Sequence, residues 1–361
     1  MKKKMLILIA AFFLVFALAA CNNSEVTSDE QAEKDNQLVV YTTIYPLQFF
    51  TEEIGGEFVA TKNIVPPGSD AHNVEVTTKT MMELAESDAF IHTGTGLESF
   101  AESVTKAVEK EDVHIVNATE HVDFIGAKED SHEDESEEDH EGHEDEFGES
   151  HDGHENESDE SHEGHDEESE ESHEEEGHAD EHDHGHPSDQ DPHVWLDPQR
   201  SITLAENIKN ALVELDPEHK EQFENNFETL KGELGKLDSE FEEMANQAKI
   251  KTFLVSHSAY GYWEDAYGLE QIGISGLSPT DEPSQKDLTE IIEMVNEENL
   301  KYIYFEPNLT NKVAEAVKNE TKTEVLTLNN LESITDENIK NDEDYLVIMR
   351  KNIEALSTGL N

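Results

Sequence analysis

The sequence predicts an α/β protein made of two small lobes with parallel-type sheets, joined by a long helix. Two observations lead to this prediction. In each half of the chain, short β-rich runs alternate with amphipathic stretches, and a strand–helix–strand succession is typical of a parallel sheet covered by helices. Between the halves lie long helical stretches where a flexible linker would be rich in glycine and serine.

Four β-rich runs lie in the first half of the chain. Strands are expected at residues 38–43, 58–65, 89–92 and 113–116. Helices are expected at residues 46–54, 77–87 and 97–110. Together these elements predict an N-terminal α/β lobe at residues 37–200, which carries an insertion at residues 127–190.

The same alternation returns after residue 250. Strands are expected at residues 252–256, 269–274, 302–305 and 324–328. Helices are expected at residues 283–299, 311–319 and 344–356. These elements predict a C-terminal α/β lobe at residues 251–361.

A helical connection is expected at residues 201–250. The stretches 198–215 and 217–248 are strongly helical in pattern, and each begins with an Asp-Pro pair. Asp is a good N-cap and Pro fits the first helical position. A connection of this kind holds two lobes nearly rigid, with a ligand cleft between them at the carboxyl ends of the strands.

The chain begins with a basic segment, an apolar run at residues 5–20, and Cys21. This run is shorter than a membrane span of roughly 20 residues, and small residues before a cysteine indicate processing. The tetrapeptide LAAC resembles a bacterial lipobox, which implies a signal peptide at residues 1–20, acylation of Cys21 and a tether at residues 21–36. An ordinary secretory signal is the alternative. Because Cys21 is the only cysteine, the protein forms no internal disulfide.

The net charge of −62 is extreme, but half of it is local. Residues 129–189 contain 31 acidic residues and no Lys or Arg, which leaves −31 for the rest of the chain. Such a surface repels nucleic acid and anionic lipid, and it attracts cations.

The acidic insertion is also rich in histidine, in a repeat of 11 residues. With one aromatic residue and almost no aliphatic ones it cannot form a core, so we expect a disordered loop. Low-complexity histidine tracts usually bind metal; a solubilising spacer is the alternative. The candidate weak metal ligands are His140, His143, His151, His154, His162, His165, His173, His178, His182, His184 and His186.

Seven histidines lie outside this tract, and three of them differ from the rest. His72, His193 and His257 each lie in a predicted loop beside a strand end, where Asp70 and Asp191 could orient two of the rings. Spacing alone leaves both a metal site and three unrelated histidines open. The remaining four are expected to be structural or solvated: His92, His114, His121 and His219.

Four segments carry a family resemblance: DPHVWLDP, SHSAYGYW, GISGLSPTDEPS and LNNLESIT. They resemble those of zinc-uptake solute-binding lipoproteins of ABC importers, the ZnuA-like metal receptors with a helical backbone. The likeness covers roughly residues 38–361. A His- and acid-rich insertion before DPHVWLDP is itself a feature of the zinc members.

The resemblance implies one metal ligand in each of four loops. Mapped onto this sequence, the ligands are His72, His193, His257 and Glu332, in the cleft between the lobes. Glu306 is the alternative to Glu332. Three imidazole nitrogens and one carboxylate suit a near-tetrahedral Zn²⁺ site. Relatives of the manganese type replace the third histidine with a carboxylate, and His257 argues against that type.

The function that the resemblance implies is transport and not catalysis. We expect a monomeric receptor, anchored through Cys21 to the outer face of the cell membrane. It would capture Zn²⁺ and deliver it to the membrane permease of an ABC transporter. The alternatives are a manganese-specific receptor of the same family, and a surface adhesin or metal buffer without a transporter.

Overall fold

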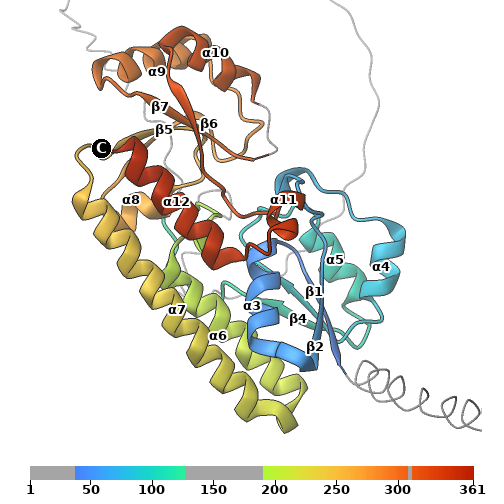
Figure 1. Cartoon of the computed structure of the whole chain (residues 1–361). Helices are drawn as coiled ribbons and strands as arrows, with labels where there is room; N and C mark the ends of the chain where they lie inside the picture. Colours follow the sequence, from blue (N-terminus) through green and yellow to red (C-terminus); the bar gives the residue numbers. More distant parts are fainter. Residues whose placement is uncertain (1–36, 127–189, 308–310) are drawn as a thin grey trace, which may run out of the picture. The chain divides into compact units, whose positions relative to one another are not determined.

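Two four-stranded parallel sheets form the framework of the protein, one in each half of the chain (Figure 1). The computed structural model describes residues 37–126, 190–307 and 311–361. The expected signal peptide, the tether with Cys21 and the histidine-rich insertion lie outside these residues. Within the described residues, no helix is both long enough and apolar enough to cross a membrane.

The N-terminal sheet has the strand order β2-β1-β3-β4, with every neighbouring pair parallel. Its strands are β1 (Leu38–Thr42), β2 (Val59–Asn63), β3 (Ala89–His92) and β4 (His114–Asn117). Its helices are α3 (Tyr45–Gly55), α4 (Thr78–Leu84) and α5 (Ala101–Val108), with a short 3-10 helix at Ala71–Asn73. These elements alternate as the sequence predicts.

The C-terminal sheet repeats this topology, with the order β6-β5-β7-β8 and parallel pairing throughout. Its strands are β5 (Thr252–His257), β6 (Glu270–Ser275), β7 (Tyr302–Phe305) and β8 (Glu324–Thr327). Its helices are α8 (Gly261–Tyr267), α9 (Gln285–Glu297), α10 (Lys312–Thr321), α11 (Asp336–Lys340) and α12 (Tyr345–Gly359). In both sheets the first strand of each half lies inside, so loops at the carboxyl ends of central strands can meet a ligand.

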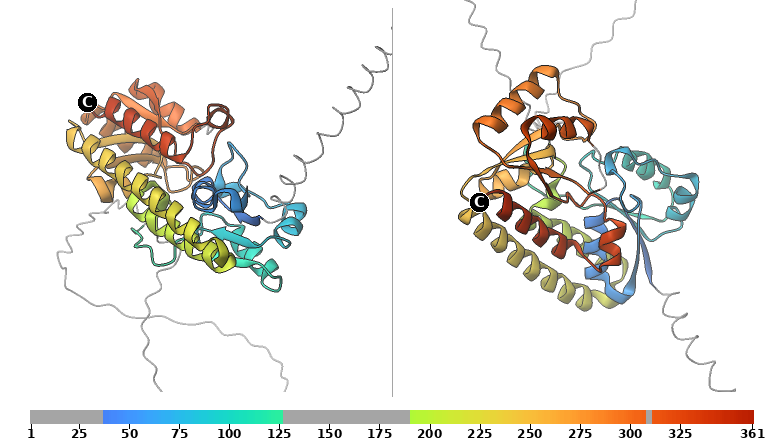
Figure 2. Two further views of the ribbon diagram at one scale, coloured as in Figure 1. Left: turned by 60° about the horizontal axis from the view of Figure 1, so that its bottom comes forward. Right: turned by 45° about the horizontal axis from the view of Figure 1, so that its top comes forward.

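The connection between the sheets consists of α6 (Pro198–Leu215) and α7 (Lys220–Gln247), which lie side by side (Figure 2). Asp197 caps α6, because its carboxylate accepts hydrogen bonds from the backbone N–H groups of Gln199 and Arg200. The long α7 packs against α3 of the first half and against α12 of the second. The predicted helical connection is therefore confirmed.

One hydrophobic cluster runs through both halves. It includes Phe50 under the first sheet, Phe241 on α7 and Tyr304 on the second sheet. A smaller cluster, around Leu254 and Ile303, lies under α9 and α10. Both sheets belong to one compact unit, so the expected lobe limits of 37–200 and 251–361 stay a prediction.

Two short helices were not expected from the sequence. Helix α8 begins with Gly261, Tyr262 and Trp263, which favour turns or strands over helices. It forms because these three residues are buried. Helix α11 has five residues and no buried side chain, and a reciprocal capping box between Thr335 and Asn338 holds its first turn.

The two ends of the insertion meet at one place. Gly126 and Gln190 form an antiparallel bridge, and the backbone N–H of Asp191 donates to the carbonyl of Ile125 at 3.1 Å. The two described residues that flank the insertion are therefore adjacent, directly before the segment that contains His193.

Candidate metal centre

The structure brings together the four side chains singled out in the sequence. His72 lies in the 3-10 helix after β2, His193 precedes α6, His257 ends β5, and Glu332 lies in the loop after β8. One potential ligand atom from each lies within 4.8 Å of all the others. Among the described residues, no other group of three or more His, Cys, Asp or Glu side chains has this arrangement.

The three imidazoles point the same nitrogen at one carboxylate oxygen. Glu332 Oε1 lies 3.4 Å from Nε2 of His72, 3.3 Å from Nε2 of His193 and 4.0 Å from Nε2 of His257. All three Nε2 atoms are buried and make no hydrogen bond within the described protein. Ligands at about 2.0–2.2 Å from a tetrahedral zinc are roughly 3.3 Å apart. The distances from Glu332 Oε1 to His72 and His193 are close to this spacing, the distance to His257 is longer, and all four ligand atoms lie within 4.8 Å of one another.

Asp191 fixes the ring of His193. Its Oδ1 lies 2.9 Å from His193 Nδ1 and accepts the backbone N–H of His193 at 2.9 Å. The hydroxyl of Tyr262 donates to the carbonyl of Asp191 at 2.8 Å, so α8 holds this segment in place. An acceptor at Nδ1 leaves the lone pair of Nε2 free for a metal, as the sequence predicts for this pair.

Glu306 plays the corresponding part for His257. Its Oε1 lies 2.9 Å from His257 Nδ1, a close contact that does not have the geometry of a hydrogen bond. Ser256 Oγ donates to the other oxygen of Glu306, and the hydroxyl of Tyr260 lies 3.4 Å from Oε1. Glu306 thus contacts the nitrogen of His257 that faces away from the cluster. The carboxylate that lies with the three histidines is Glu332 and not Glu306.

Asp70 acts on the backbone and not on the ring of His72. Its carboxylate caps the 3-10 helix, accepting from the backbone N–H of His72 at 2.9 Å and from Asn73 Nδ2 at 2.7 Å. The sequence-based expectation that Asp70 orients this imidazole is wrong, because the capping geometry uses both carboxylate oxygens. His72 is also the least buried of the four, with 14% of its side chain exposed.

Contacts from several elements hold the loop that carries Glu332. Asn330 Nδ2 donates to Glu332 Oε1 at 2.9 Å, and the backbone N–H of Ala71 donates to Oε2 at 3.3 Å. Trp195 Nε1 donates to the carbonyl of Asn330 at 2.7 Å. The backbone N–H of Tyr45 donates to the carbonyl of Glu332 at 3.2 Å, which ties this C-terminal loop to α3.

The backbone before Glu332 is strained. Leu331 is fully buried and has φ of 64°, a left-handed conformation that costs a non-glycine residue about 1–3 kcal/mol. The side chain of Asn329 maintains it by accepting the N–H of Leu331 at 2.8 Å. The side chain of Asn352 on α12 holds the backbone of Asn329 in turn. Its Oδ1 accepts from the N–H of Asn329 at 2.9 Å, and its Nδ2 donates to the carbonyl of Asn329 at 2.8 Å.

The charges of the metal-free cluster are complementary. Burial lowers the pKa of His193, but the interactions with Asp191 and Glu332 outweigh it and raise this pKa to about 9. Burial raises the pKa of Glu332, yet His193 and His72 together bring it well below its usual range. Without metal, the site therefore holds a proton on His193 beside an ionised Glu332.

A sequence model described as "Zinc-uptake complex component A periplasmic" matches residues 40–359. The chain belongs to the zinc-uptake complex component A family.

Relatives of known name agree with this family assignment. The high-affinity zinc uptake system protein ZnuA of Bacillus subtilis is 31% identical over 98% of this chain and 97% of its own length. The zinc-binding protein AdcA of Streptococcus pyogenes serotype M3 is 33% identical over 99% of this chain. This member of the zinc-uptake complex component A family spans 61% of the length of that AdcA.

Solved structures share the fold. The Zn(II)-bound ZnuA-like domain of Streptococcus pneumoniae AdcA matches with a TM-score of 0.65 and 28% identity, covering 90% of this chain and 99% of that domain. The laminin-binding protein Lmb of Streptococcus agalactiae, described as a bifunctional protein with adhesin and metal transporting activity, matches with a TM-score of 0.68. Its identity is 26%, over 90% of this chain and 100% of Lmb.

The other four histidines among the described residues of this family member lie outside the cluster. His92 packs on Phe90, His114 lies 3.9 Å from a carboxylate oxygen of Glu214, and His219 stacks on Phe58. His121 is exposed. The eleven candidate ligands of the insertion and Cys21 lie outside the described residues. Sequence reasoning missed the orienting role of Glu306, although its position directly after β7 is a signal.

Zinc binding to this family member should depend on pH through His193. Because its pKa is raised to about 9 in the metal-free protein, Nε2 carries a proton below that pH, and a metal must displace it. We expect the apparent affinity to fall by roughly tenfold for each pH unit below 9. Titration calorimetry at pH 7, in buffers of different ionisation enthalpy, should show proton release. A binding enthalpy that is the same in all buffers would contradict the assignment.

Proposed function

We propose that this protein is an extracytoplasmic receptor that captures Zn²⁺ and delivers it to the permease of an ABC importer. The observation that carries the proposal is the convergence of three buried, otherwise unbonded Nε2 atoms on Glu332 Oε1, with all ligand atoms within 4.8 Å. The names of relatives support it, since they describe zinc-binding and zinc-uptake proteins. All four candidate ligands come from one chain, so a monomer suffices.

The donor set favours zinc over manganese. Imidazole nitrogen suits borderline ions such as Zn²⁺, whereas Mn²⁺ prefers carboxylate, carbonyl and water oxygens. Here three of the four candidate donors are nitrogen. The two nearby carboxylates that could add oxygen donors, Asp191 and Glu306, face the opposite ring nitrogens of His193 and His257.

The arrangement suits a carrier and not an enzyme. A catalytic zinc keeps an open position for water beside a general base. With four protein ligands, a tetrahedral site has no such position. Asp191 and Glu306, the carboxylates that could act as bases, are already engaged with the histidine rings.

Cell adhesion or passive metal buffering is a second candidate function. It is favoured by the similarity to Lmb, whose description joins adhesin and metal transporting activity. Growth under zinc chelation separates the candidates, because only a receptor for uptake is required by the cell when zinc is scarce.

Each of His72, His193 and His257 should be required for tight zinc binding. Zinc in four-ligand protein sites is held by roughly 10–16 kcal/mol, so losing one ligand should weaken binding on the order of a hundredfold. Glu332→Ala should weaken it less, because water can replace a carboxylate oxygen. Competition with a zinc chelator measures the four alanine variants. His219→Ala, outside the cluster, is the matched control. Wild-type affinity in His193→Ala would rule out the proposed ligand set.

Acylation of Cys21 should anchor the protein on the outer face of the cell membrane. A diacylglyceryl group supplies two chains, enough for stable anchoring where one chain binds only marginally. We expect Cys21→Ala to be released into the medium or left unprocessed. Fractionation of cells that make the variant tests this. A variant that is still membrane-bound at the mature size means that the anchor lies elsewhere.

Deletion of residues 127–189 should remove weak metal sites and leave the tight one. The fold tolerates the cut because Gly126 and Gln190 are already bridged, and the four candidate ligands lie outside it. We expect an unchanged unfolding midpoint for the metal-free protein and one tight zinc per molecule. Calorimetric titration of both proteins counts the sites. Loss of the tight site, or a wild type that binds one ion in total, argues against weak collecting sites in the insertion.

A further inference from the structure

A small cavity, called the rear cavity below, borders Glu332 and none of the other three candidate ligands. Its lining includes Asp70, Glu306, Asn330, Glu332, Ser333 and Thr335. Its volume of about 10 Å³ is at the lower limit of the space that one water molecule needs. Two of its walls are buried carboxylates, since Glu306 is 6% and Glu332 is 2% exposed. A polar cavity of this size favours a water molecule beside the Glu332 carboxylate.

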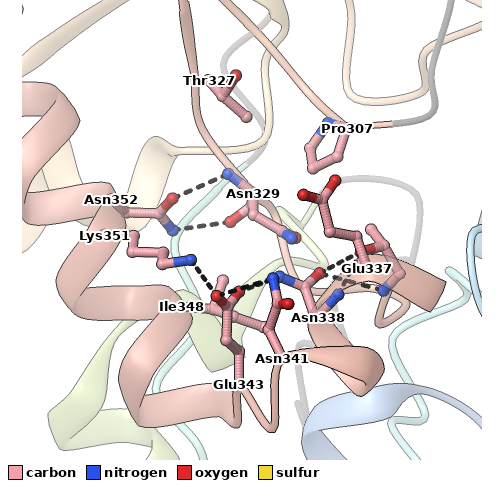
Figure 3. A pocket seen from close by; sticks show the side chains of 11 residues that line it. Pro307, Thr327, Asn329, Glu337, Asn338, Asn341, Glu343, Ile348, Lys351 and Asn352 are labelled. Atoms are coloured by element: carbon pink, nitrogen blue, oxygen red, sulfur yellow. Dashed lines mark hydrogen bonds and ion pairs between the residues drawn. The ribbon is translucent and has the colours of Figure 1, made fainter.

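This cavity borders a second pocket that reaches exposed residues. The two share Gly68 and Thr335 in their walls, and the second adds Pro67 and Glu337, which are exposed. A third pocket, between α11 and α12, shares Asn329 and Thr335 with the cavity (Figure 3). In Figure 3 the Asn329–Asn352 pair forms one wall of that pocket.

A separate opening lies on the His72 side of the cluster. This mouth pocket is lined by His72, Thr95, Gln190, Pro192, Ser278 and Asp281. Of the four candidate ligands, only His72 borders it, and only Glu332 borders the rear cavity. The mouth pocket and the rear cavity therefore border different candidate ligands.

The ligand on the rear side is the easier one to exchange. Asp191 makes a hydrogen bond to Nδ1 of His193, and a carboxylate oxygen of Glu306 lies 2.9 Å from Nδ1 of His257. The carboxylate of Glu332 is held by two neutral donors, Asn330 Nδ2 and the more distant N–H of Ala71 at 3.3 Å. Replacing Glu332 by water exchanges one oxygen donor for another, whereas replacing His72 costs zinc a preferred nitrogen donor.

We propose that zinc exchange begins at Glu332, with water supplied through the rear cavity. The oxygen of a water molecule takes the coordination position that Glu332 Oε1 leaves, and no electron is transferred. The three histidines hold the ion until this step is complete. The inference rests on the proposed zinc site. It adds which ligand leaves the ion first and from which side the replacing water arrives.

Matched serine-to-leucine variants test the route. Ser333→Leu fills the rear cavity, Ser278→Leu narrows the mouth pocket, and Ser357→Leu adds the same side chain on the exposed surface of α12. Zinc-loaded protein is mixed with excess chelator in a stopped-flow instrument, and the equilibrium Kd is measured separately by competition. We expect Ser333→Leu to release zinc at least about tenfold more slowly, with Kd within about twofold of wild type. The other two variants should match wild type.

Blocking a route slows capture and release equally, so an unchanged Kd distinguishes it from damage to the site. Ser69→Leu narrows the rear cavity from its other wall and carries the test if Ser333→Leu does not fold. Wild-type release rates in both rear-cavity variants overturn the proposal, and so does slow release in Ser278→Leu alone. Failure of the zinc site itself is seen separately, as the absence of tight zinc binding in the unaltered protein.

Discussion

Glu332 is a charged side chain with almost no access to water, and the arrangement of the described residues around it follows from that constraint. A buried carboxylate is costly unless cations or hydrogen-bond donors surround it. Here three imidazoles approach one of its oxygens, and Ala71 donates to the other. In the metal-free state the negative charge of Glu332 is balanced by the proton on His193, and a divalent cation can replace that proton. A site that is stable with either occupant can be emptied and refilled without unfolding.

Holding four donors at one point requires contacts from segments far apart in the chain. His72 follows β2, the edge strand of the first sheet, whereas His257 ends β5, an inner strand of the second sheet, and the two side chains meet in one group. Trp195 then joins the His193 segment to the Glu332 loop through the carbonyl of Asn330. The hydrophobic cluster shared by both halves supports these contacts. Opening the halves as rigid bodies would expose part of that core at about 25 cal/mol per Å², which makes loop movement the cheaper change.

The sequence predicts the strands, the parallel sheets and the connecting helices well, because alternating apolar patterns and Asp-Pro helix starts are local signals. The histidine positions are also readable, since His193 and His257 stand where strands and helices begin or end. Glu332 could not be chosen from pattern alone in a chain with 86 acidic residues. The roles of Asp70 and Glu306 depend on three-dimensional geometry, because a carboxylate can cap a backbone or orient a ring. Helix α8 was missed for a similar reason, since burial overrides its local preferences.

The bridge between Gly126 and Gln190 has a consequence for how the acidic repeat can change over generations. For a loop of the kind that the sequence predicts between them, the entropy of closure grows only with the logarithm of length, and doubling the length costs about 0.6 kcal/mol. Gain or loss of one 11-residue unit is thus almost neutral for folding. The number of repeats can therefore change at little cost in stability, while the sheets and the cluster stay constant.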